Sequence, residues 1–133
     1  MLKRLLAAFF FVVASTAVSQ DRAGIEQTIS DQLEAFNARD VNTAWSFASP
    51  MIQGMFGSPE NFGMMVQRGY PMVWTNDAPE FMGLREQSGR IVQTVRLRDT
   101  SGQLHVLDYE MLMMNDIWLI NGVYLVPQPG VSA

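Results

Sequence analysis

The spacing of the apolar residues changes once along this chain, and that change limits the fold more than any other feature. Up to about Pro71, apolar residues recur every three or four positions, which is typical of helices that bury one face. Beyond Pro71 they alternate with polar residues in short runs that turn residues separate, which is typical of antiparallel strands. The order predicts an α+β domain, with N-terminal helices packed on a curved antiparallel β-meander.

Three helices are expected before Pro71, each bounded by capping or breaking residues: 22–39, 41–48 and 60–69. Asp40 is placed to cap the second helix, which Pro50 should end. The pair Ser58-Pro59 reads as a cap followed by proline at the first helical position of the third. One stripe of the first helix should face the core: Ile25, Ile29, Leu33 and Phe36.

Five strands are expected after the helices: 72–75, 80–86, 90–99, 103–114 and 117–126. The turns between the longer runs are short, which predicts antiparallel neighbours in a meander. If Arg98 pairs with Leu104, the helix-facing side of the sheet is mostly apolar and the outer side is charged. Asn121-Gly122 is expected to form a glycine bulge that bends the last strand. A bent sheet closed over by the long first helix would form a cone.

The N-terminus has the order of features that is typical of a secretory signal peptide. Two cations stand among the first four residues, 5–13 is an unbroken apolar run, and small residues follow as far as Ser19. Cleavage is expected before Gln20, with a second option two residues earlier. The apolar stretch ends by Val18, whereas a membrane-spanning helix needs about 20 such residues. An uncleaved anchor is the alternative.

Signal cleavage would leave one domain, residues 20–133, in the periplasm or outside the cell. Loss of Lys3 and Arg4 would change the formal net charge from −4 to −6 and leave arginine as the only basic residue type. No basic cluster remains, which argues against nucleic acid and anionic membranes as partners. With no cysteine, the signal cannot carry a lipid anchor, and disulfides are excluded.

Metal and cofactor sites are not expected. The absence of cysteine removes thiolate sites, and His105 is the single histidine, without a second ligand at zinc-binding spacing. Methionines are numerous, but the groups at 64–65 and 111–114 lack neighbouring histidines that would suit copper. Core packing is the favoured interpretation of these methionines.

Several segments resemble a family of small secreted bacterial proteins described as domain of unknown function 4864. They are Asp31-Gln32-Leu33-Glu34-Ala35-Phe36, Ala44-Trp45-Ser46-Phe47-Ala48-Ser49-Pro50, Phe62-Gly63-Met64-Met65-Val66 and Trp118-Leu119-Ile120-Asn121-Gly122. The helix-then-meander layout is also similar to the wider nuclear transport factor 2-like superfamily of cones. The resemblance implies a cone fold over about 25–126, and it implies no particular chemistry, because that superfamily contains both enzymes and non-catalytic modules.

The leading hypothesis is a non-catalytic module that binds a small apolar ligand or a partner protein. Polar and aromatic residues on the expected concave side are the candidate pocket residues: Trp45, Tyr70, Gln93, Tyr109 and Trp118. Gln93 and Tyr109 would lie on an apolar face and therefore need hydrogen-bond partners from a helix, a water or a ligand. The alternative is that Trp45, Tyr70 and Trp118 simply pack in the hydrophobic core.

Two other functions remain open. A small lyase or isomerase could use Tyr109 with His105 or Asp108, provided that these groups meet in one pocket. Asp108 and Glu110 share one strand face, which also suits a solvated exterior with cross-strand ion pairs. No catalytic residue is assigned. The third possibility is a structural module that forms a homodimer through its sheet.

Overall fold

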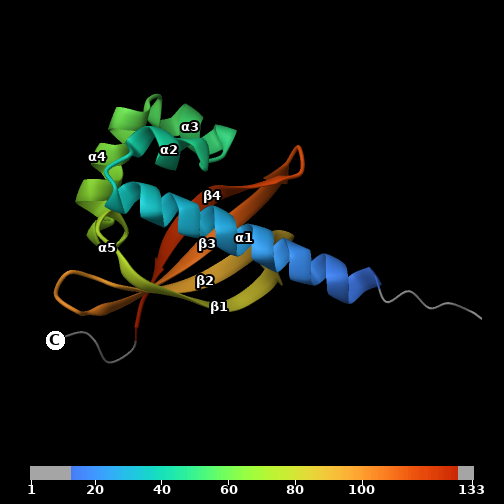
Figure 1. Ribbon diagram of the computed structural model, residues 1–133. Helices are drawn as coiled ribbons and strands as arrows, with labels where there is room; N and C mark the ends of the chain where they lie inside the picture. Colours follow the sequence, from blue (N-terminus) through green and yellow to red (C-terminus); the bar gives the residue numbers. More distant parts are fainter. Residues whose placement is uncertain (1–12, 129–133) are drawn as a thin grey trace, which may run out of the picture.

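The computed structural model describes residues 13–128 of the chain, and side chains from residue 21 onward (Figure 1). Helices precede strands in the described part, in the order α1 Val13–Asn37, α2 Val41–Ser46, α3 Pro50–Phe56, α4 Pro59–Gly69, α5 Pro71–Trp74, β1 Asp77–Gln87, β2 Arg90–Arg98, β3 Leu104–Met114 and β4 Ile117–Val126. The strands form one antiparallel sheet in the order β1-β2-β3-β4. The predicted α+β class, with helices packed on an antiparallel meander, is confirmed.

The predicted sheet register is also confirmed. Arg98 pairs with Leu104 across the β2–β3 turn, so the two strands turn their apolar residues to the same side. In β4 the pairing shifts between Glu110–Gly122 and Met111–Ile120, which leaves Asn121 as an extra residue. This is the bulge that the Asn121-Gly122 pair predicts.

The sequence analysis is wrong about two segments that begin with proline, a strand expected at 72–75 and a helix missed at 50–56. Residues 72–75 do not form a strand, because Pro71 starts the short helix α5, in which the neighbours Met72 and Val73 are both buried. Adjacent buried residues suit a helix, whereas a strand would turn them to opposite faces. Pro50 does not only end a helix. It begins α3, and Ser49 caps that helix by accepting a hydrogen bond from the Ile52 N–H at 3.3 Å.

The core lies between α1 and the concave side of the sheet, which α1 crosses (Figure 1). Its centre consists of side chains that are at most 1% exposed, from both layers: Ile25, Ile29, Leu33, Phe36, Val95, Leu97, Leu107 and Tyr109. The predicted apolar stripe of the first helix is therefore buried as expected. Burying a large apolar side chain contributes about 1.5–3 kcal/mol, so this layer dominates the stability of the fold.

The helices α2, α3 and α4 gather beyond β4, the edge strand on that side (Figure 1). Two backbone hydrogen bonds of 2.8 Å tie β4 to the segment between α2 and α3, from the Ser49 N–H to the Ile120 carbonyl and from the Ile120 N–H to the Phe47 carbonyl. Farther along β4, the Tyr70 hydroxyl donates to the Val123 carbonyl at 3.0 Å. The helices are thus attached to β4 on both sides of its bulge.

The predicted signal peptide, 1–19, lies largely outside the described residues and stays a prediction. Among the residues that were described, no helix has the length and apolar character needed to cross a membrane.

Candidate functional site

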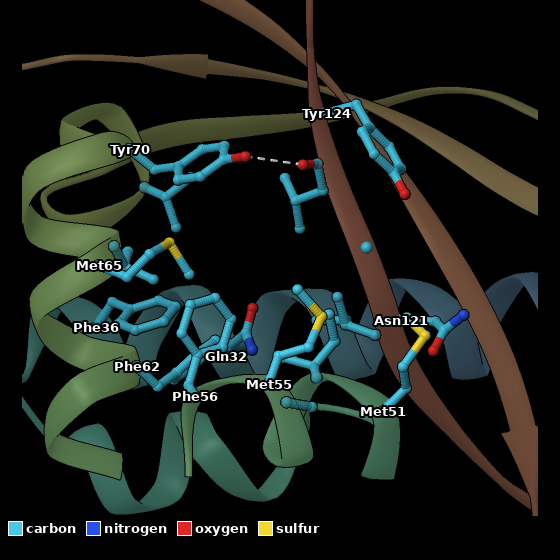
Figure 2. A pocket seen from close by; sticks show the side chains of 17 residues that line it. Gln32, Phe36, Met51, Met55, Phe56, Phe62, Met65, Tyr70, Asn121 and Tyr124 are labelled. Atoms are coloured by element: carbon cyan, nitrogen blue, oxygen red, sulfur yellow. Dashed lines mark hydrogen bonds between the residues drawn. The ribbon is translucent and has the colours of Figure 1, made fainter. Parts of the chain in front are cut away.

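A cavity of about 240 Å³ lies between α3, α4 and β4 (Figure 2). Its walls are mainly the rings and thioethers of Phe36, Phe56, Phe62, Met51, Met55 and Met65. It lies beside the part of β4 between Ile120 and Val123, the two residues that are hydrogen-bonded to the helical region, and the bulge bends the strand there. The cavity thus lies at the bend of β4, between the two places where the helices are hydrogen-bonded to this strand.

The floor of the cavity is a cluster of aromatic rings. Phe62 stands at its centre, with ring centroids at 5.8 Å from Phe36, 5.6 Å from Trp45 and 5.9 Å from Phe56. Tilted and edge-on ring pairs at these separations stabilise the fold by more than the burial of their apolar surface alone would. The floor is therefore a firm surface, built by α1, α2, α3 and α4 together.

The exposed lining residues, which mark the mouth of the cavity, are Met51 and Met55 of α3 and Tyr124 of β4. No residue of α3 is fully buried, and Met51 and Met55 are 54% and 67% exposed. Large thioether side chains at such exposure are flexible and adapt to apolar partners of different shapes. The helix ends at Gly57, which has a left-handed backbone with φ of 79°.

Four side chains with polar groups line the cavity, those of Gln32, Tyr70, Asn121 and Tyr124, and the last of these is 54% exposed. The Tyr70 hydroxyl donates to the Val123 carbonyl. The Asn121 side chain accepts from the Ser49 hydroxyl and donates to Glu110. Gln32 uses only its Nε2, which donates to the Ala44 carbonyl at 3.1 Å. Figure 2 shows its carboxamide oxygen directed toward the cavity.

Asn121 links the cavity to the outer face of the sheet. It accepts from the Ser49 hydroxyl at 2.7 Å and donates to Glu110 at 2.7 Å, and Arg90 pairs with Glu110 at 3.1 Å. Ser49 is fully buried and Glu110 is 7% exposed, so both need these bonds. Because Ser49 also caps α3, the bulge residue holds the helix that forms the cavity mouth.

The family model described as Domain of unknown function (DUF4864) matches residues 18–133, most of the chain. The chain belongs to this family. Comparison with curated proteins gives no match, and comparison with solved structures gives none either. The resemblance to the nuclear transport factor 2-like superfamily therefore stays a prediction, while the family itself is confirmed.

The five candidate pocket residues of this family member do not share one site. Tyr70 lines the cavity, and Trp45 packs behind it against Phe62. Trp118 lies apart, next to Gly24 of α1, and its carbonyl accepts from the Thr28 hydroxyl. The remaining two, Gln93 and Tyr109, are fully buried on the helix-facing side of the sheet.

Gln93 and Tyr109 face each other across β2 and β3. The Gln93 Nε2 donates to the Thr94 carbonyl at 2.9 Å and to the Gly83 carbonyl at 3.3 Å, but its Oε1 has no partner in the described part of the chain. The Tyr109 hydroxyl has none there either. Burial raises the pKa of Tyr109, and nearby Tyr70 raises it further, so the phenol stays neutral.

Residues that the sequence analysis did not single out form much of the cavity. Gln32 carried a usable signal, because it falls at a core position of the stripe Ile25, Ile29 and Phe36 and is polar. Met51 and Met55 carried none, since the helix that presents them was not predicted.

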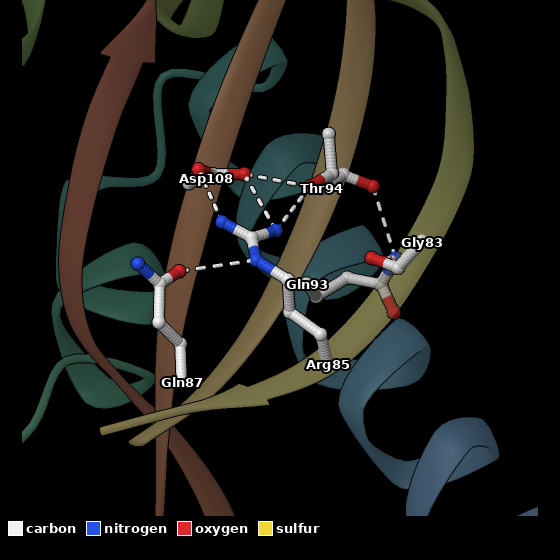
Figure 3. A network of polar contacts seen from close by, with 6 residues as sticks. All are labelled: Gly83, Arg85, Gln87, Gln93, Thr94 and Asp108. Atoms are coloured by element: carbon white, nitrogen blue, oxygen red, sulfur yellow. Dashed lines mark hydrogen bonds and ion pairs between the residues drawn. The ribbon is translucent and has the colours of Figure 1, made fainter. Parts of the chain in front are cut away.

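The groups of the enzyme hypothesis do not converge. Asp108 lies on the outer face, where Arg85 pairs with it at 2.8 Å and the Thr94 hydroxyl donates to it at 2.6 Å (Figure 3). His105 contacts Asp99 at 2.7 Å near the β2–β3 turn. Four residues of strand, about 13 Å, separate His105 from Tyr109.

The outer face is an exterior of ion pairs, as its charge pattern predicts. The arginines that hold Asp108 and Glu110 are Arg85 and Arg90, whereas Arg96 pairs with Glu80. Burial alone would raise the pKa of Asp108, but the hydrogen bonds from Arg85 and Thr94 outweigh it and lower that pKa. These carboxylates are thus engaged in structure.

Asp99 and His105 form a similar local contact. The Ser101 hydroxyl and His105 both lower the pKa of Asp99, which also accepts from the Ser101 and Gln103 N–H groups. This arrangement closes the β2–β3 turn. Within the described residues, no group of three or more histidines and carboxylates is arranged to hold a metal ion. A homodimer through the sheet stays a prediction.

Proposed function

We propose that this domain binds a small apolar molecule in the cavity between α3, α4 and β4, and that it does so without catalysing a reaction. The observation that carries this proposal is the cavity itself, about 240 Å³ of space walled by phenylalanine and methionine side chains. An apolar cavity of about 150 Å³ is enough to hold benzene. The space here suits a molecule with one substituted ring or a short branched chain.

The position of the cavity supports entry from solvent. It opens beside Met51 and Met55, which are more than half exposed, and α3 contributes no buried residue to the core. Elements with few buried contacts open at low free-energy cost. A small displacement of α3 would admit a ligand and leave the layer between α1 and the sheet unchanged.

The compartment is part of the proposal and rests on the sequence. The pattern of residues 1–19 supports export, and an acidic chain without cysteine is compatible with an extracytoplasmic space. The ligand would then be a molecule present outside the cytoplasm.

Toluene titrated into the full-length protein tests the proposal. We expect amide signals of α3, α4 and β4 to shift in ¹H–¹⁵N spectra, and the melting temperature to rise, because a ligand that binds only the folded state stabilises it. Shifts spread evenly over the molecule, or none, would count against a specific site.

Two neighbouring methionines of α4 provide a matched pair of variants. Met65 lines the cavity, whereas Met64 is 46% exposed and does not. Met65→Trp should fill the space and abolish the toluene response, and Met64→Trp should leave it unchanged. Circular dichroism shows whether both variants are folded. Equal toluene binding by the two folded variants would place the site elsewhere and refute the proposal.

A further inference from the structure

We infer that the ligand of this cavity is a neutral molecule with one hydrogen-bond donor, an O–H or N–H group, and that the side-chain oxygen of Gln32 accepts that bond. The inference rests on the proposed function, since it names the chemistry of a molecule bound at the same site. It depends on the orientation of the Gln32 amide, on the hydrogen bonds that the other polar side chains of the cavity wall already form, and on the absence of charged side chains from that wall.

The orientation of the Gln32 amide follows from its hydrogen bond. Nε2 lies 3.1 Å from the Ala44 carbonyl, which can only accept, so the NH₂ group must face Ala44 and the oxygen must face away. The residue is 3% exposed and lines the cavity. Figure 2 shows the oxygen on the cavity side of the amide. Among the described residues, no donor reaches it.

The Gln32 oxygen borders the cavity and is not one of the fully enclosed atoms without a partner, so solvent in the cavity can reach it. A ligand that displaces this solvent must supply a donor, because leaving the acceptor unsatisfied would cost about 1–3 kcal/mol. Tyr70 and Asn121 do not compete, because Tyr70 donates to the Val123 carbonyl and Asn121 is bonded at both ends of its amide. Tyr124 also lines the cavity, but its side chain is 54% exposed, so solvent can satisfy its hydroxyl. Gln32 is therefore the buried side chain of the wall whose oxygen can select a ligand that carries a donor.

The ligand must also be uncharged. No charged side chain lines the cavity in the described part of the chain. A bound ammonium or carboxylate would lose its hydration without gaining an opposite charge, which is strongly unfavourable. A carboxylate would in addition bring no donor to the Gln32 oxygen. Phenols, alcohols and small amides meet both requirements.

Two probes that share a methylbenzene ring isolate the hydrogen bond, p-cresol with a hydroxyl and toluene without it. The quantity to measure is the ratio of their dissociation constants, by calorimetry on the full-length protein. The ratio matters more than either affinity, because the cost of removing the hydroxyl from water is the same for every variant and cancels. One neutral hydrogen bond corresponds to about 0.5–1.5 kcal/mol, or about 3- to 10-fold in the ratio.

Gln32→Met removes the acceptor at nearly constant volume, and Gln53→Met is its matched control. Gln53 also donates its Nε2 to a carbonyl of the α2 helix, that of Trp45 at 3.0 Å, but it does not line the cavity. We expect Gln32→Met to lower the preference for p-cresol over toluene about 3- to 10-fold, and Gln53→Met to leave it unchanged.

The outcomes separate this inference from the proposed function. If neither probe binds the unaltered protein, the proposed function is wrong. If both probes bind and Gln32→Met changes both affinities by the same factor, the cavity is a ligand site but the Gln32 oxygen does not select its ligand, and the inference is overturned. If Gln32→Met does not fold, the Gln32 side-chain NH₂ signals of the unaltered protein provide the second measurement. They should shift with p-cresol and not with toluene, and equal responses to the two probes would overturn the inference.

Discussion

The two faces of the sheet differ in whether their polar side-chain atoms have hydrogen-bond partners. On the outer face, Asp108 and Glu110 each have at least two partners, from arginine and from a neutral side chain. On the helix side, the Gln93 oxygen and the Tyr109 hydroxyl are fully buried and have no partner in the described part of the chain, and the Gln32 oxygen faces a cavity. The two carboxylates of the outer face thus have hydrogen-bond partners within the described residues, whereas the Gln93 and Tyr109 oxygens of the helix side have none there.

This difference indicates where the molecule can still form interactions. A charged group that is already paired has little to gain from a new contact, whereas a buried polar atom without a partner gains from a water or a ligand. The helix side is thus the side to examine for binding. Asn121 is the exception that joins both faces, because its amide lies at the cavity wall and bonds to a carboxylate of the outer face.

Asn121→Ala should have the largest effect on stability, since it breaks the link between the faces. It removes a bonding partner from the buried Ser49 hydroxyl and from Glu110. Buried polar groups that lose their partners cost about 1–3 kcal/mol each, so we expect a loss of about 2–4 kcal/mol in the free energy of unfolding. Urea denaturation measures it. Toluene binding should weaken as well, because Ser49 caps the helix at the cavity mouth.

Asn61→Ala is the control for this variant. Asn61 is exposed and donates one bond, to the Phe56 carbonyl at 3.1 Å. Its replacement should cost about 0.5–1 kcal/mol. Similar losses for the two variants would mean that the link through the bulge is not special, and the proposed coupling of the two faces would fail.

Most of the sheet could be predicted from the sequence, because its signals are local. Alternation in 90–98 and 104–114, joined by the turn at Gly102, sets the register of one residue against another. The bulge was predictable for the same reason. Pro50 and Pro71 were misread because proline marks both the end of one helix and the start of the next, and the residues on either side of it decide which.

The candidate site was much less predictable. A cavity depends on how far apart the helices and the strand lie, and this distance results from contacts between distant residues, such as Tyr70 with Val123. Periodicity along one element carries no information about that distance. Tyr70 was found through its residue type alone. Gln32 could have been found by asking which polar residue occupies an apolar stripe.

Two tyrosines test the difference between satisfied and unsatisfied polar groups directly. Tyr70→Phe removes a hydroxyl that donates to the Val123 carbonyl and should cost about 1 kcal/mol of stability. Tyr109→Phe removes a fully buried hydroxyl without a partner in the described residues, and should be neutral or stabilising by up to about 1 kcal/mol. Thermal and urea unfolding of both variants give the comparison. A substantial loss for Tyr109→Phe would show that its hydroxyl is satisfied, by a water or a bound molecule.

The smallest effect is expected on the outer face, at Asp108. Hydrogen bonds from Arg85 and Thr94 keep the pKa of Asp108 below its usual value, despite its partial burial. A carboxylate whose folded pKa is depressed stabilises the protein above the pKa of the unfolded chain, about 3.9, and this stability is lost as the pH falls through the folded pKa. Because the Arg85 side chain is 42% exposed, solvent screens the pair, and Asp108→Asn should cost less than about 1 kcal/mol at pH 7.

The same variant should be less sensitive to acid. Between about pH 5 and pH 2 the unaltered protein should lose more stability than Asp108→Asn, so that their melting temperatures converge. Asp116→Asn removes the same formal charge from an exposed turn residue that forms no ion pair among the described residues, and serves as the control. Melting temperatures that stay equally far apart at both ends of this range would show that Asp108 gains nothing from its partners. The outer face would then be no better satisfied than the helix side.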